Sequence, residues 1–173
     1  MIYKKSYFIF AAVLLSLITL STANAHLMVA QKGTLNIVDN DAFMVLSLPV
    51  SAFNNLEFDS NNDGLLDMFE FNKNRERMAE LVLSSVHLIN ADTKIVLQGI
   101  RLLPELSHKD QQQIVVLGKF SMSEQKNDIA LAISLFSKNA SEDVLSIRVS
   151  NKATNEFNEF ELNPYNRNAK LFR

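Results

Sequence analysis

Between residues 86 and 162 the chain alternates short apolar runs with polar breaks, and this pattern constrains its fold more than any other feature. The breaks are rich in Asn, Asp, Ser and Lys, which is typical of turns between the strands of an antiparallel sandwich. Six runs rich in β-branched and other apolar residues are predicted as strands, at 86–89, 93–103, 114–122, 129–136, 144–149 and 157–162.

Two further strands are predicted nearer the N-terminus, at 33–38 and 42–48. The residues between them, Asp39, Asn40 and Asp41, favour a turn, so the two strands form a hairpin. The following proline ends the second strand because proline cannot donate a hydrogen bond to a neighbouring strand. With the six later runs, the total is about eight strands.

Helical signals lie between the second and third predicted strands. Ser51 can cap a short helix over 52–58, and residues 68–85 contain no Gly or Pro and repeat their apolar side chains near helical spacing. The sequence therefore predicts a mainly β fold with an α insertion. It predicts an antiparallel β-sandwich of about eight strands that carries one helix-loop-helix at about 50–85.

The N-terminal segment has the pattern of a secretory signal peptide. A basic start precedes an apolar stretch over 8–20, and an A-x-A pattern ends at Ala25. The apolar stretch is shorter than the ~20 residues that a membrane-spanning helix needs, so cleavage after Ala25 is predicted. We expect a signal peptide over 1–25 and a single domain over 26–173, periplasmic or secreted, with no membrane span after cleavage.

Composition limits the possible functions. Removal of the signal peptide would take away two basic residues and leave 15 basic and 19 acidic residues, a net charge of −4. The charges are of mixed sign with no basic tract, so no nucleic-acid partner is expected. The chain has no Cys, no G-x-S-x-G or H-E-x-x-H motif and no phosphate-binding Gly loop. No catalytic residue is predicted, and we expect a non-enzymatic protein.

One twelve-residue segment, 59–70, carries oxygen-bearing side chains at alternate positions: Asp-Ser-Asn-Asn-Asp-Gly-Leu-Leu-Asp-Met-Phe-Glu. Ca²⁺ takes six to eight oxygen ligands at about 2.3–2.6 Å, and alternate residues of a tight loop can point inward together. The predicted ligands are the side chains of Asp59, Asn61, Asp63, Asp67 and Glu70 and the backbone carbonyl of Leu65, with Gly64 at the sharp turn.

The spacing of this segment resembles the calcium loop of the EF-hand family. The resemblance covers about 35 residues, 50–84, and implies that Glu70 binds through both oxygens and that Asp67 binds directly or through water. EF-hand loops usually occur in pairs, but the sequence contains no second loop of this spacing. The sandwich or a partner chain is therefore expected to brace the loop, and a weak affinity of about 10⁻⁴–10⁻³ M is predicted.

Three functions are consistent with the sequence. The first is a secreted or periplasmic calcium-binding module in which Ca²⁺ is structural for the helical insertion. The second is a copper-handling or copper-dependent protein: cleavage would leave His26 at the N-terminus, which resembles the amino-terminal copper sites of some secreted β-sandwich proteins, with His87, His108 or Met28 as a second ligand. The third is an accessory domain of a membrane transport complex, because a sandwich interrupted by a calcium loop resembles the extracytoplasmic portion of some bacterial transporters of the nickel and urease-accessory kind.

Overall fold

The computed structural model describes residues 30–53, 58–91, 93–106, 112–122 and 128–172. In these residues the chain is mainly β, as predicted, with strands in two sheets and a single α-helix, α2 (Met68–Ser85). A 3-10 helix, η1 (Val50–Phe53), precedes α2. The strands are β1 (Lys32–Val38), β2 (Asp41–Pro49), β3 (Val86–Asn90), β4 (Thr93–Val96), β5 (Gln98–Glu105), β6 (Gln113–Ser121), β7 (Ile129–Ile133), β8 (Leu145–Asn151), β9 (Glu156–Leu162) and β10 (Asn168–Lys170).

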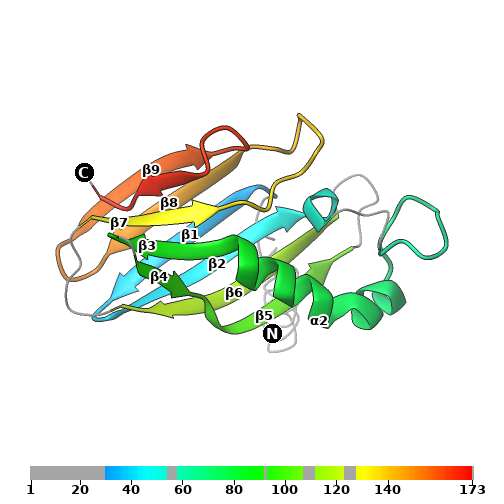
Figure 1. Cartoon of the computed structure of the whole chain (residues 1–173), viewed down its shortest axis with the longest axis horizontal. Coiled ribbons are helices and arrows are strands. Elements are labelled where there is room, and N and C mark those ends of the chain that lie inside the picture. The colour runs from blue at the N-terminus through cyan, green and yellow to red at the C-terminus, as the bar shows by residue number, and fades with distance from the viewer. Residues whose placement is uncertain (1–29, 54–57, 92, 107–111, 123–127, 173) are drawn as a thin grey trace, which may run out of the picture.

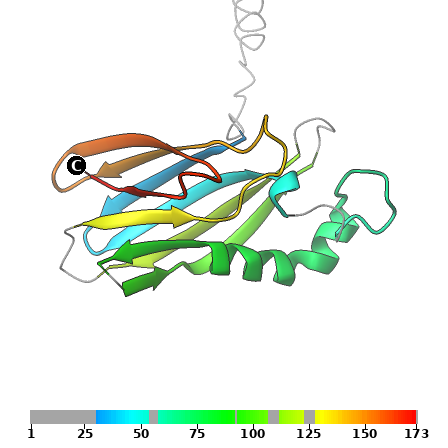
Figure 2. The same ribbon diagram turned by 45° about the horizontal axis from the view of Figure 1, so that its top comes forward.

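The two sheets form two layers that face one another (Figures 1 and 2). One has six strands in the order β5-β6-β2-β1-β8-β9, and the other has four in the order β10-β7-β3-β4. The prediction of an antiparallel arrangement is wrong for one pair: β1 and β8 run parallel, with Lys32 opposite Ser146 and Ile37 opposite Asn151. These strands are far apart in the sequence, and alternation of apolar residues carries no information on their relative direction.

The core lies between the sheets and receives alternate residues from their strands. Leu35 and Ile37 of β1 are buried while their neighbour Asn36 is exposed, which is the period of two expected for a half-buried strand. Buried apolar side chains of both sheets, of η1 and of α2 belong to one continuous cluster. Its largest fully buried members include Phe53, Phe58, Phe120, Leu46, Leu48, Met78, Leu88 and Ile133.

The predicted strand over 93–103 is two strands, and the chain changes sheet between them. β4 belongs to the four-stranded sheet and β5 to the six-stranded sheet, and the residue between them, Leu97, is buried. The pairing of β5 with β6 then shifts register between Gln98 and Arg101, where Gly99 has a φ of +62°. Glycine adopts this left-handed conformation without steric cost, so it suits the irregularity that redirects the chain.

Gly118 on β6 provides the space that Leu97 fills. A Cβ atom at Gly118 would lie 2.7 Å from Cδ1 and 2.8 Å from Cγ of Leu97, well inside van der Waals contact. We therefore expect Gly118→Ala to displace Leu97 and to lower the free energy of unfolding by about 1–3 kcal/mol, measured by urea denaturation. Adding Leu97→Val should recover part of the loss. An unchanged stability of Gly118→Ala would contradict this packing.

The segment between β2 and β3 differs in part from the predicted helix-loop-helix. Helix α2 spans the predicted range. The predicted helix over 52–58 begins instead as η1, whose residues Val50, Ala52 and Phe53 are buried, and Phe58 lies in a turn. Val50, Ala52 and Phe53 pack into the core within this single 3-10 turn, and the remaining residues of the predicted helix, 54–57, lie outside the described residues. The described residues thus do not support an EF-hand helix-loop-helix and contain only its second helix.

Two other predictions are the N-terminal signal peptide and the absence of a membrane span after its cleavage. The predicted signal peptide over 1–25 lies outside the described residues and stays a prediction. Of the helices that the structure describes, none is long and apolar enough to cross a membrane.

Candidate metal-binding loop

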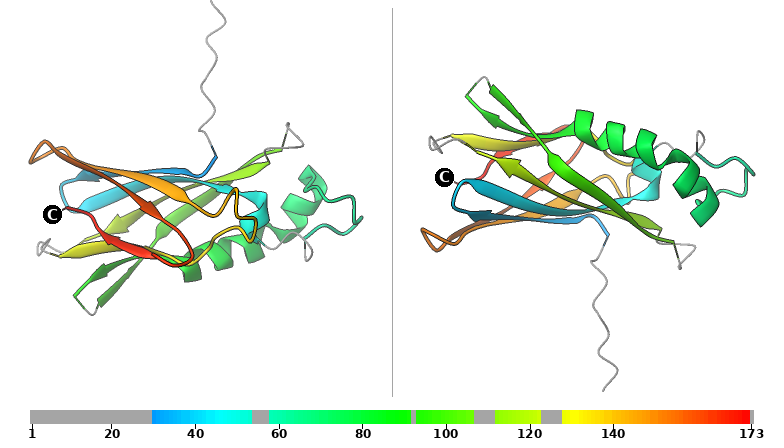
Figure 3. Two further views of the ribbon diagram at one scale, coloured as in Figure 1. Left: turned by 90° about the horizontal axis from the view of Figure 1, so that it is seen from above. Right: turned by 90° about the horizontal axis from the view of Figure 1, so that it is seen from below.

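The loop that leads into α2 projects beyond the end of both sheets (Figures 1 and 3). All six predicted ligands and Gly64 lie within the described residues. Gly64 has a φ of +81°, which is the conformation that the sharp turn of a calcium loop requires and that glycine adopts most readily. The structure therefore has a sharp turn at the predicted position.

Side-chain oxygens of the first half of the loop accept hydrogen bonds from the loop backbone. Asp59 uses both oxygens, with Oδ1 accepting from the Asp63 N–H at 3.2 Å and Oδ2 from the Gly64 N–H at 2.8 Å. Asn61 Oδ1 accepts from the Asp63 N–H at 2.9 Å, and Asp63 Oδ1 accepts from the Leu65 N–H at 2.9 Å. These bonds hold a tight turn.

Glu70 closes the loop from the first turn of α2. Its Oε1 accepts from the Ser60 N–H at 2.7 Å, the Ser60 hydroxyl at 2.9 Å and the Asn61 N–H at 3.3 Å. Its Oε2 accepts from the Asp67 N–H at 3.2 Å, and the Asp67 side chain caps the helix by accepting from the Glu70 N–H at 2.8 Å. Glu70 therefore connects both ends of the loop.

The electrostatic environment keeps Glu70 ionised. Burial acts to raise its pKa, but hydrogen bonds from the backbone of Asp67, Ser60 and Asn61 and from the Ser60 hydroxyl outweigh burial. The pKa of Glu70 is held below its ordinary value of 4.5. At neutral pH the side chain is a carboxylate.

Asp59 and Glu70 are the two acidic side chains that are buried among the described residues, with exposed fractions of 8% and 1%. Neither forms an ion pair with a basic residue in that part of the chain, where the ion pairs join Lys119 to Asp41 and Lys170 to Asp128. A buried carboxylate is normally paired with a basic side chain or bound to a metal. Two buried acids at opposite ends of one loop, without a basic partner, are therefore unusual.

The donor set of the loop fits Ca²⁺ in its chemistry. Every donor is a hard oxygen, and a carboxylate oxygen that accepts one amide hydrogen bond, as each Asp59 oxygen does, has a further lone pair for a cation. Glu70 Oε1 already accepts three hydrogen bonds, so it would have to release some of them to bind a cation. However, the structure does not gather the predicted ligands around one point. In the described ranges, no three His, Cys, Asp or Glu side chains are arranged so that they could hold a metal ion.

Gln112 is a residue of this site that the sequence did not indicate. Its Oε1 accepts from the Leu66 N–H at 2.8 Å, and its Nε2 donates to the Leu66 carbonyl at 2.9 Å. Leu66, in the middle of the loop, is only 2% exposed. In the sequence Gln112 is the second of three consecutive glutamines, and nothing in that run marks it as a contact of the loop.

No family model matches the chain. No curated protein sequence matches it either.

His87 is the one predicted copper ligand that the structure describes, since His26, Met28 and His108 lie outside the described residues. It lies on β3, opposite Val96 of β4. Its Nδ1 atom is buried and has no hydrogen-bond partner among the residues that the structure describes. Burial lowers the pKa of His87 below its ordinary value of 6.5, and the positive charge of Lys94 lowers it further. The copper hypothesis stays a prediction.

Replacement of His87 by leucine is expected to raise the free energy of unfolding by about 1 kcal/mol, because it removes a buried nitrogen without a partner. The lowered pKa also means that the unfolded chain binds this proton more readily than the folded chain. Stability is therefore lost as the pH falls through about 6.5, and His87→Leu lacks this part of the loss. Melting temperatures at pH 7.5 and 5.5 measure both effects. If the melting temperature falls equally between pH 7.5 and pH 5.5 in the wild type and in His87→Leu, the expected pH dependence is contradicted.

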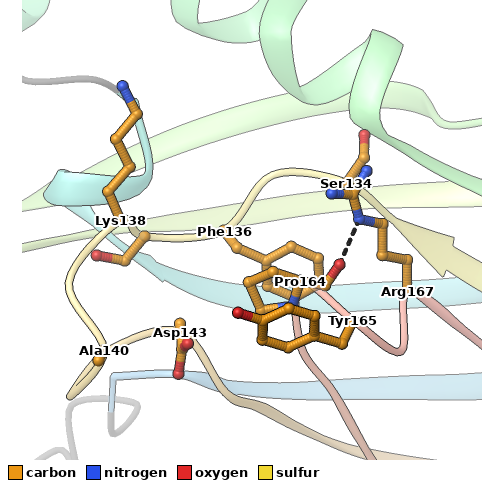
Figure 4. Close-up of a pocket in the computed structure, with 9 residues that line it drawn as sticks. Ser134, Phe136, Lys138, Ala140, Asp143, Pro164, Tyr165 and Arg167 are labelled. Carbon is orange, nitrogen blue, oxygen red and sulfur yellow. Dashed lines mark hydrogen bonds between the residues drawn. The ribbon is translucent and has the colours of Figure 1, made fainter.

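A hollow of about 440 Å³ lies in another part of the described chain, and the sequence did not indicate it. Arg167 donates from Nε to the Pro164 carbonyl at 2.8 Å there (Figure 4). In the described residues, no buried polar side chain without a partner lines the hollow, so we assign it no ligand. Its lining residues are Ser134, Phe136, Ser137, Lys138, Ala140, Asp143, Pro164, Tyr165 and Arg167.

Proposed function

We propose that the protein is a secreted or periplasmic, non-enzymatic calcium-binding module whose site is the loop over 59–70. The observation that carries the proposal is the pair of buried carboxylates, Asp59 and Glu70, which lack a basic partner among the described residues. The ligands would be the side chains of Asp59, Asn61, Asp63, Asp67 and Glu70 and the carbonyl of Leu65.

Ca²⁺ would be structural for the helical insertion. Four carboxylates within one loop repel one another, and a divalent cation replaces this repulsion with attraction. Because Glu70 belongs to α2 and the other ligands belong to the loop, binding would tie the start of the helix to the loop. A ligand that binds only the folded state also stabilises that state by mass action.

Thermal unfolding of the purified protein tests the proposal. With a dissociation constant of 0.1–1 mM and 10 mM Ca²⁺, stabilisation should be about 1.4–2.7 kcal/mol. For a chain of this length we expect the melting temperature in Ca²⁺ to lie about 3–11 °C above that in chelator. Mg²⁺ at the same concentration is the control for non-specific charge screening, and its shift should be smaller.

The same measurement separates calcium from the second hypothesis. If Ca²⁺ leaves the melting temperature unchanged, the calcium proposal fails. If Cu²⁺ raises it instead, and removal of His26 abolishes that effect, the amino-terminal copper site is favoured.

A further inference from the structure

The loop meets the body of the protein at Leu66. Its side chain is buried in the common core, whereas the neighbouring Asp67 and the turn at Gly64 are exposed. A projecting loop is otherwise held mainly by its own internal hydrogen bonds. The backbone of Leu66 is therefore one point through which the rest of the fold can fix the position of the flanking ligands.

Gln112 binds both backbone groups of Leu66. Its side-chain amide accepts from the N–H at 2.8 Å and donates to the carbonyl at 2.9 Å, as an adjacent strand would. The backbone of Gln112 is fixed in turn, since its carbonyl accepts from the Val50 N–H at 3.0 Å. Gln112 immediately precedes β6, which pairs with β2 and β5 inside the six-stranded sheet. The loop is thus tied to the start of an interior strand.

We infer that Gln112 is a positioning residue for the calcium site, and that it lets this single loop bind Ca²⁺ without pairing with a second loop. The inference rests on the proposed function. Leu66 lies between Leu65, whose carbonyl is a proposed ligand, and Asp67, so a shift of its backbone moves two ligands. Because Gln112 occupies the N–H and carbonyl of Leu66, these groups are not available for pairing with the loop of another chain.

Calcium titration of the full-length protein and of Gln112→Met tests this role. Methionine is similar in size to glutamine but lacks the amide, so both hydrogen bonds to Leu66 are lost. We expect calcium affinity to fall on the order of tenfold or more, the usual effect of removing a group that orients metal ligands. Gln98→Met, at an exposed glutamine of β5, is the matched control and should bind as the wild type does.

The calcium-induced rise in melting temperature separates positioning from a structural role. A purely structural role would lower the melting temperature equally with calcium and with chelator and leave the rise unchanged. If Gln112→Met does not fold, Gln112→Glu decides, because it keeps an acceptor for the Leu66 N–H and loses the donor to the carbonyl. If the variant that folds binds Ca²⁺ at least as tightly as the wild type does, the inference is overturned.

The oligomeric state supplies an independent outcome. We expect one Ca²⁺ per chain and a monomer with and without Ca²⁺ by light scattering. Calcium-driven dimerisation of the wild type would overturn the inference while leaving the proposed function intact. Absence of any calcium binding by the wild type would instead overturn the proposed function.

Discussion

Replacement of Glu70 by glutamine is expected to abolish the calcium-dependent rise in melting temperature. Glutamine keeps the size of the side chain but removes its charge and one of the two carboxylate oxygens proposed to bind Ca²⁺. Calcium affinity depends on the number of charged ligands. The loss of affinity in Glu70→Gln should therefore exceed the roughly 10- to 100-fold loss that follows when a residue that only orients the ligands is replaced. Isothermal titration calorimetry measures the affinity, and thermal unfolding with calcium and with chelator measures the stabilisation.

Glu70→Gln should also lower stability without calcium. The side chain accepts hydrogen bonds from Ser60, Asn61 and Asp67, and a neutral amide oxygen accepts them less strongly than a carboxylate. Glu76→Gln is the matched control, because Glu76 is exposed on the same helix. The control should retain the calcium effect. If Glu70→Gln retains it as well, Glu70 is not a ligand and the proposed site is wrong.

The parts of the fold that were predicted correctly depend on local sequence patterns. Helix α2 could be located because residues 68–85 lack Gly and Pro and repeat their apolar side chains near helical spacing. Most strands could be located from alternation and turn residues. The passage of the chain between sheets at Leu97 could not, because it depends on the space at Gly118, which belongs to a distant strand.

The candidate site shows the same division between local and distant contacts. The proposed ligands and Gly64 lie within twelve consecutive residues, so their spacing in the sequence was enough to suggest them. The hydrogen bonds of Glu70 with Ser60 and Asn61 agree with that local order. Gln112 contacts Leu66 across 46 positions, and its role depends on how β6 is placed beside the loop. Without the fold, no pattern in the glutamine run could reveal it.

The start of the loop depends on a buried aromatic side chain, and its loss should have the largest effect on stability. Phe58 immediately precedes the first proposed ligand, Asp59, and is only 1% exposed. The guanidinium carbon of Arg77, on α2, lies 5.4 Å from the centre of its ring, which is within the range of a cation–π interaction. Phe58 therefore joins the core, the loop and the helix.

Phe58→Ala is expected to lower the free energy of unfolding by about 3–5 kcal/mol, because it leaves a cavity and removes the contact with Arg77. The melting temperature should fall by about 6–20 °C. Phe157→Ala is the matched control: Phe157 is 74% exposed on β9, and its loss should change stability by no more than about 0.5 kcal/mol. Urea denaturation of the two variants measures the difference. Equal effects would mean that Phe58 is not packed in the core, and the loop would then lack the anchor that holds Asp59 in place.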